Sequence, residues 1–191
     1  MRKKSLWLIV SVMACLFLLA ACARDKEPAE LGLKAAEEAL NAGKAEIGKY
    51  VPEQLKGLEA AIKGAKEKME KKEYTEALNA VKDIPGKVKE AAAAAAAKKA
   101  AMTKEWEALS AELPKMVEDI KAKIAPLAKA KKLPAGNKAK LDGANAGLGE
   151  IAKGWAEAEG AFKTGNISDA IAKAKGLKDK ANEILVSLGM K

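Results

Sequence analysis

Residues 88–127 read VKEAAAAAAAKKAAMTKEWEALSAELPKMVEDIKAKIAPL, and the spacing of their apolar side chains decides the fold. Apolar residues recur there at steps of three and four, from Val88 through Trp106 to Leu127. That spacing lines one face of an α-helix and approaches the seam of a coiled coil. The alanine run at 91–97 has very high helix propensity, so we interpret it as helix and not as a flexible linker.

The same periodicity covers the rest of the chain from residue 31 onward. No stretch alternates apolar and polar residues over the length of a strand, and β-branched residues are sparse, so the sequence predicts an all-α fold. Turn residues at 48–52, 72–73, 133–137 and 164–166 separate about five helices. We expect these helices at 30–47, 53–71, 74–112 running on to about 131, 137–163 and 167–188. Three prolines, Pro85, Pro114 and Pro126, should each kink or break the third helix.

An internal repeat appears when the chain is shifted by 93 residues. The shift places Leu58 on Ile151 and Met69 on Phe162, and it aligns the segments YTEAL at 74–78 and ISDAI at 167–171. Each copy is predicted to be a helical hairpin. One arrangement is therefore two three-helix bundles that share a long kinked helix, and the alternative is a single elongated antiparallel bundle.

Alanine supplies much of the apolar content, so the core should be thin and the helices should pack closely. The spacing Gly143-x-x-x-Gly147 suits such close approach. We interpret Trp106 and Trp155 as core residues, because both fall on the apolar stripe, and a role as ligand platforms is the less favoured alternative.

The N-terminal segment has the features of an export signal. Residues 1–4 carry Arg2, Lys3 and Lys4, and residues 6–21 (LWLIVSVMACLFLLAA) carry no charge. A membrane span is the alternative, but the run is slightly short of the roughly 20 apolar residues that a bilayer needs. The run ends in Leu19-Ala20-Ala21-Cys22, which resembles the lipobox of bacterial lipoproteins. The rival Val12-Met13-Ala14-Cys15 has a bulky Met where a small residue is wanted.

The lipobox resemblance implies that diacylglycerol alkylates Cys22 and that a signal peptidase recognises Leu19, Ala20 and Ala21 and cuts before Cys22. Stable anchoring takes more than one acyl chain. By resemblance, Ala23 favours the outer membrane, facing the periplasm, in a Gram-negative host. We expect a signal peptide at 1–21, a lipidated tether at 22–30, a first helical repeat at 31–90, a connecting helix with a basic tip at 91–136, and a second repeat at 137–191.

The composition argues against an enzyme. The chain has no histidine and two cysteines, of which Cys22 is expected to be acylated. This composition removes most nucleophile–base pairs and the common transition-metal sites. Adjacent carboxylates such as Glu37-Glu38 lie beside lysines and are typical of a solvated face. We therefore expect no catalytic residue, metal or cofactor. The export signal and the interleaved acidic residues also argue against a nucleic-acid partner.

The segment 120–141 contains seven lysines and no acidic residue. A basic tip of this kind attracts lipid headgroups or wall polyanions, although an incidental solvated tip is the simpler alternative. The lysines are Lys121, Lys123, Lys129, Lys131, Lys132, Lys138 and Lys140.

The chain ends at Lys191, in the position that Braun-type murein lipoprotein joins to peptidoglycan, and covalent wall attachment is a weaker hypothesis here. The mature region as a whole resembles Ala/Lys-rich envelope lipoproteins with helical-hairpin repeats. We expect a non-enzymatic scaffold that is held at the membrane by acyl chains on Cys22 and docks an envelope protein or wall component. The alternative is a binder of anionic lipid or wall polyanion through amphipathic helices and the basic tip.

Overall fold

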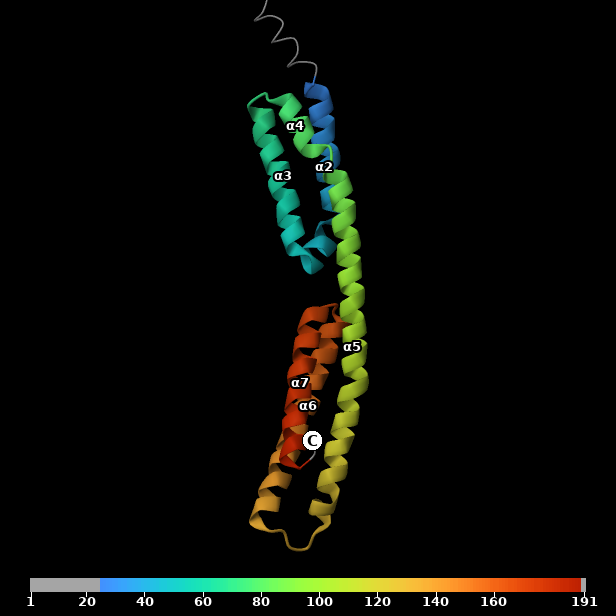
Figure 1. Ribbon diagram of the computed structural model, residues 1–191, viewed down its shortest axis with the longest axis vertical. Coiled ribbons are helices and arrows are strands. Elements are labelled where there is room, and N and C mark those ends of the chain that lie inside the picture. Colours follow the sequence, from blue (N-terminus) through green and yellow to red (C-terminus); the bar gives the residue numbers. More distant parts are fainter. Residues whose placement is uncertain (1–24, 190–191) are drawn as a thin grey trace, which may run out of the picture. The chain divides into compact units, whose positions relative to one another are not determined.

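The structure is a computed structural model that describes residues 25–189. This range contains six α-helices and no strand, so the all-α prediction is confirmed. The helices are α2 (Lys26–Tyr50), α3 (Pro52–Glu70), α4 (Tyr74–Val81), α5 (Ile84–Lys129), α6 (Ala135–Lys163) and α7 (Ile167–Ser187). They fall into two compact units that divide between Lys98 and Lys99. The described part of unit 1 is residues 25–98, that of unit 2 is residues 99–189, and α5 contributes to both (Figure 1).

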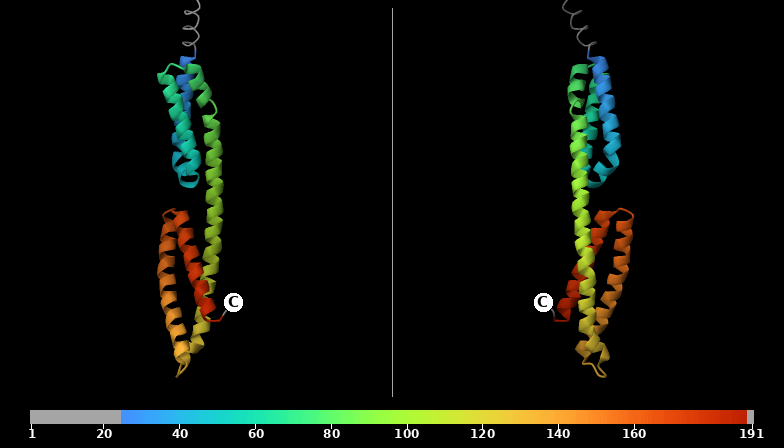
Figure 2. Two further views of the ribbon diagram at one scale, coloured as in Figure 1. Left: turned by 60° about the vertical axis from the view of Figure 1, so that its left-hand side comes forward. Right: turned by 90° about the vertical axis from the view of Figure 1, so that its right-hand side faces the viewer.

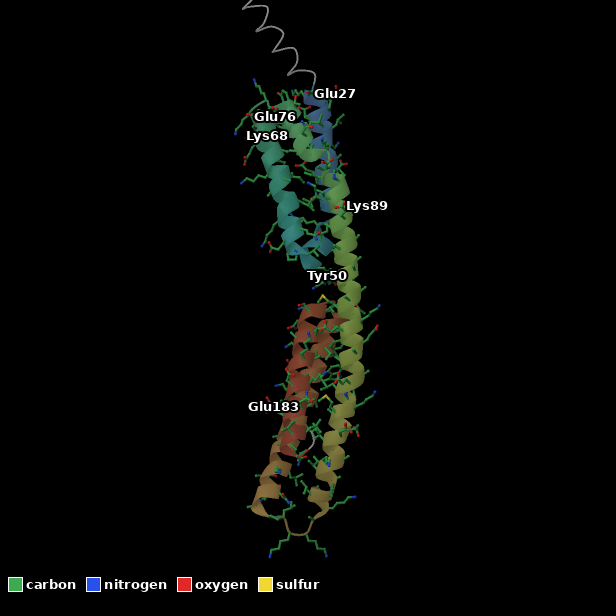
Figure 3. All side chains as sticks on the ribbon, viewed as in Figure 1. Glu27, Tyr50, Lys68, Glu76, Lys89 and Glu183 are labelled. Atoms are coloured by element: carbon green, nitrogen blue, oxygen red, sulfur yellow. The ribbon has the colours of Figure 1, made fainter. Side chains whose placement is uncertain are left out.

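Unit 1 is a bundle of α2, α3 and a third arm made by α4 and the start of α5. Tyr50, at the end of α2, lies at the opposite end of this bundle from Lys68, near the end of α3, as expected for antiparallel helices (Figure 3). Aliphatic side chains from all three arms form its core. The buried core residues are Ala36, Leu40, Ile47, Leu58, Ile62, Ala65, Val81, Ile84, Val88 and Ala91.

Unit 2 is a bundle of the second part of α5, α6 and α7 (Figure 2). Two neighbouring clusters make up its core, and both draw on all three helices. The first holds Leu113, Met116, Ile120, Ile124, Ala144, Ile151, Ala181 and Ile184. The second holds Trp106, Leu109, Ala158, Ile167, Ala170, Ile171 and Ala174.

The expected third helix, 74–112 running on to about 131, is wrong as one element. It divides at Lys82 and Asp83, and α5 begins just before Pro85. Proline is favoured in a first helical turn because its missing N–H has no intrahelical partner there, so Pro85 begins a helix and does not merely kink one. Pro114 and Pro126, in contrast, lie inside α5 without ending it. The core residues on either side of Pro114 hold the helix together despite the lost hydrogen bond.

The first helix begins earlier than its periodicity indicates. It starts at Lys26, and Ala29 is fully buried, so residues 26–30 belong to the bundle and not to the expected tether. Pro28 is tolerated because it lies in the first turn. The Thr75 hydroxyl of α4 donates a hydrogen bond to the Asp25 carboxylate over 2.6 Å, which ties the start of α2 to the third arm.

The predicted repeat matches the geometry of two turns that lie 93 residues apart. Lys72 follows α3 with a φ of 62°, and Gly165 follows α6 with a φ of 78°. In both turns the N–H of this residue donates to the carbonyl three positions earlier, over 3.0 and 2.8 Å. The next N–H donates to the carbonyl five positions earlier, over 2.9 and 2.8 Å. This is the Schellman pattern, and it closes the helix in the same way in both units.

Burial follows the same offset through the second and third arms. Six buried positions correspond: Leu58 with Ile151, Ala65 with Ala158, Ala77 with Ala170, Val81 with Ala174, Val88 with Ala181, and Ala91 with Ile184.

The first arms correspond at a different offset, 73 residues, which the sequence comparison missed. It pairs Ala36 with Leu109, Leu40 with Leu113 and Ile47 with Ile120, all of them buried. The first hairpin of unit 2 is therefore about 20 residues longer than that of unit 1, and the extra length lies towards the α5–α6 loop.

Candidate functional site

The seven lysines predicted as a basic tip lie around the loop that joins α5 to α6. Helix α5 ends at Lys129 and α6 begins at Ala135, so the two helix ends and the loop between them are close neighbours. All seven lysines are exposed. Lys121 contacts the Glu118 carboxylate at 2.9 Å, whereas within the described range the other six have no acidic partner within ion-pair distance. The first turn of α6 also lacks an acidic residue, so the positive charge of these six lysines is uncompensated.

Elsewhere in the bundles, lysines pair with glutamates on neighbouring helices. In unit 2, Lys178 of α7 contacts Glu112 of α5 at 2.8 Å. In unit 1, Lys44 of α2 contacts Glu59 of α3 at 2.7 Å. Each such exposed pair contributes little to stability, but together the pairs neutralise the surface over which they lie.

Three of the five described aromatic residues form one stack in unit 2. Trp106 lies between Trp155, at 5.1 Å between ring centroids, and Phe162, at 4.8 Å, and the rings are nearly parallel. Trp106 is buried, as the core interpretation requires. Trp155 packs against the core but stays half-buried, with one edge open to a surface groove.

That groove lies between α5 and α6 and has a volume of about 350 Å³. We call it the unit 2 groove. Its walls are mostly apolar, with a Glu118–Lys121 pair at the rim. The apolar walls come from Leu113, Pro114, Val117, Leu148, Ile151, Ala152 and Trp155.

Unit 1 has a groove of about 510 Å³ at the same position, but charged side chains span it. At the offsets that align the two bundles, Lys44 corresponds to Val117 and Glu59 corresponds to Ala152. The Lys44–Glu59 ion pair therefore crosses the α2–α3 groove at the place where unit 2 has two apolar side chains.

A second cross-helix pair differs in the same way. Lys66 contacts Glu37 at 2.5 Å in unit 1, whereas the corresponding residues of unit 2 are Glu159 and Ser110, which cannot form an ion pair. Asn41 between them becomes Pro114. An alignment of the two copies that allowed for the longer hairpin could have found this groove from the sequence.

Close helix packing in unit 2 depends on glycine at only one of the two expected positions. A Cβ on Gly147 would lie 2.5 Å from Ile184, whereas a Cβ on Gly143 would meet nothing within 4 Å. A second close approach, at Gly154, involves Leu177 at 2.7 Å. Among the described residues, every fully buried side chain is apolar, and no cluster of acidic or sulfur-containing side chains could hold a metal ion.

The other predicted site residues lie outside the described range: Leu19, Ala20, Ala21 and Cys22 before it, and Lys191 after it. Between residues 25 and 189, none of the helices combines the length and apolar character needed to span a bilayer. No protein-family model matches the chain, and neither the curated proteins nor the solved structures contain a significant match to it.

Proposed function

We propose that this chain is a lipid-anchored protein of the bacterial cell envelope, processed and acylated at Cys22. The observation that carries the proposal is the lipobox Leu19-Ala20-Ala21-Cys22 behind a charged start and an apolar run. The fold is compatible with cleavage there. Among the described residues, the first buried one is Ala29 and the last is Ile184, so all of these core residues remain in a chain that begins at Cys22.

The anchored bundles act, in this proposal, as a non-enzymatic interaction module for an envelope protein or wall component. Histidine is absent from the whole chain, and the thiol of Cys22 is consumed by acylation. Both units present helix faces to solvent, and such faces dock partner helices through side chains at steps of three and four. Crosslinking in intact cells, followed by mass spectrometry, should recover one reproducible partner. Crosslinks scattered over abundant envelope proteins alone would count against the module.

Anchoring is tested by replacing Cys22 with serine and comparing that variant with Cys15→Ser. The full chain is expressed in a bacterium that is fed a labelled fatty acid. The parent and Cys15→Ser should incorporate the label and sediment with membranes, whereas Cys22→Ser should remain unlabelled and uncleaved. Label retained by Cys22→Ser, or lost from Cys15→Ser, would show that the lipobox is misassigned.

A second candidate function, binding of anionic lipid or wall polyanion, is favoured by the six basic-tip lysines without acidic partners. Binding to vesicles that contain phosphatidylglycerol should fall steeply as salt is raised. Replacing Lys129, Lys131 and Lys132 with glutamine should weaken that binding. The control, glutamine at three exposed lysines outside the tip (Lys87, Lys89 and Lys98), removes the same charge and should weaken it much less. Equal effects would show a general charge effect and no tip.

A further inference from the structure

The unit 2 groove has two chemically different ends. Consecutive helices joined by a short loop run antiparallel, so Leu113 of α5 lies near Trp155 of α6 and Lys121 lies near Leu148. Lys121 lies eight positions after Leu113 in the helix, a length of about 12 Å at the usual rise of 1.5 Å per residue. The groove therefore runs from an aromatic end at Trp155 to a charged end at Lys121.

Beyond its charged end the surface becomes strongly basic. Glu118 offsets Lys121, with which it pairs at 2.9 Å, so the rim itself is close to neutral. From Lys123 to the end of α5, and through the loop into α6, lysines follow with no acidic residue up to Leu141. An apolar channel thus leads into a positively charged surface within one unit.

The corresponding groove of unit 1, about 510 Å³ in volume, differs from the unit 2 groove in the chemistry of its walls. The Lys44–Glu59 pair of unit 1 crosses the corresponding groove, where unit 2 has Val117 and Ala152. The same backbone therefore accommodates either a bridging ion pair or an open apolar floor. Unit 1 shows that the bundle does not require the apolar version.

We propose that the unit 2 groove binds a single-chain anionic amphiphile, with its hydrocarbon chain along Val117 and Ile151, its tail end at Trp155, and its acidic head towards the basic tip. The apolar walls match the chain, and the unpaired lysines match the head by charge. The inference does not depend on lipidation of Cys22, so either proposal can fail without the other.

The test uses the chain from residue 22 with Cys22→Ser, which keeps every buried residue of the described range, from Ala29 to Ile184. Dodecanoate, kept below micelle formation, is titrated in by calorimetry, and tryptophan emission is followed in parallel. Trp155 lines the groove, so its emission should change on saturation. Dodecylammonium, with the same chain and the opposite charge, should bind at least tenfold more weakly.

The decisive variant is Val117→Lys combined with Ala152→Glu, which installs the unit 1 ion pair. It should weaken dodecanoate binding at least tenfold and leave the thermal unfolding transition nearly unchanged, because unit 1 already accommodates this pair at the matching position. Ala152→Leu, which blocks the groove without adding charge, is the second variant and should also weaken binding. It keeps the test valid if the double variant folds poorly.

Three outcomes would overturn the proposal. In the first, dodecanoate does not bind, or binds both groove variants as tightly as the parent. In the second, dodecylammonium binds equally well, which removes the role of the basic tip. In the third, light scattering shows a dimer that the double variant dissociates, with no dodecanoate uptake by the parent, so that a second copy covers the groove.

Discussion

Replacing Lys72 with glycine should stabilise unit 1 by about 1 kcal/mol. Lys72 has a φ of 62°, and within residues 25–189 it is the one non-glycine residue with a left-handed backbone conformation. That conformation costs an L-residue about 1–2 kcal/mol, which the substitution would remove. Glycine loses more conformational entropy on folding than lysine does, and this loss offsets roughly 0.5–1 kcal/mol of the gain. Gly165 occupies the equivalent turn, so the fold already accepts glycine there. For a unit of this size the gain corresponds to a rise in melting temperature of about 4–8 °C.

The distribution of aromatic residues allows the two units to be followed separately. In the chain from residue 22, both tryptophans, Trp106 and Trp155, belong to unit 2, and both tyrosines, Tyr50 and Tyr74, belong to unit 1. Tryptophan emission therefore follows the unfolding of unit 2, while far-UV circular dichroism follows both units. Lys72→Gly should raise the melting temperature of unit 1, which is seen in the dichroism signal but not in tryptophan emission.

Two controls make the argument specific to the turn. Gly165→Ala imposes on unit 2 the strain that Lys72 imposes on unit 1. It should lower the free energy of unfolding of unit 2, measured by tryptophan emission, by about 1 kcal/mol. Lys71→Gly, at a φ of −78°, relieves no strain and should lower stability by roughly 0.5–1 kcal/mol. A Lys72→Gly variant no more stable than the parent, or matched by Lys71→Gly, would refute the reasoning.

Three further predictions concern packing. Gly149→Ala should stabilise unit 2 by about 0.8–1 kcal/mol in denaturant unfolding. Gly147→Ala should be less stable than Gly149→Ala by about 1–3 kcal/mol, because its Cβ would lie 2.5 Å from a side-chain carbon of α7. Ile47→Ala and Ile120→Ala, at equivalent fully buried positions, should each cost about 2–5 kcal/mol, but only the second should move the emission transition. Pro114→Ala restores an intrahelical hydrogen-bond donor in α5. It should raise the free energy of unfolding of unit 2 by up to about 3 kcal/mol.

The helices were predictable from the sequence because each has one apolar face with a clear period. The turns at 72–73 and 164–166 were predictable because the residues there interrupt that period. The boundaries that failed involve proline. Whether Pro85 or Pro114 ends a helix depends on the packing around it, which local spacing does not contain. Residues 26–30 looked like a tether because they are polar, yet Ala29 is fully buried beneath them.

The basic tip was predictable because seven lysines without an acid form a local run in the sequence. Local spacing does not reveal the unit 2 groove, because the groove depends on which residues face each other across two helices. That pairing requires two offsets, 73 and 93 residues, and a single shift of the chain recovers only the second. Val117 and Ala152 are unremarkable singly and become informative only when aligned with Lys44 and Glu59.

Stability alone does not account for the divergence between the two grooves. An exposed ion pair contributes about 0–1 kcal/mol, so exchanging Lys44–Glu59 for the types found at Val117 and Ala152 changes the folding free energy very little. Because Ala152 is exposed in the folded protein, the apolar version also gains little from burial of this side chain. A bound chain changes this balance, since each methylene removed from water contributes about 0.8 kcal/mol. Four to six buried methylenes would then contribute about 3–5 kcal/mol to binding, before its entropic cost. That is more than the ion pair of unit 1 or the apolar pair of unit 2 contributes to the folding free energy.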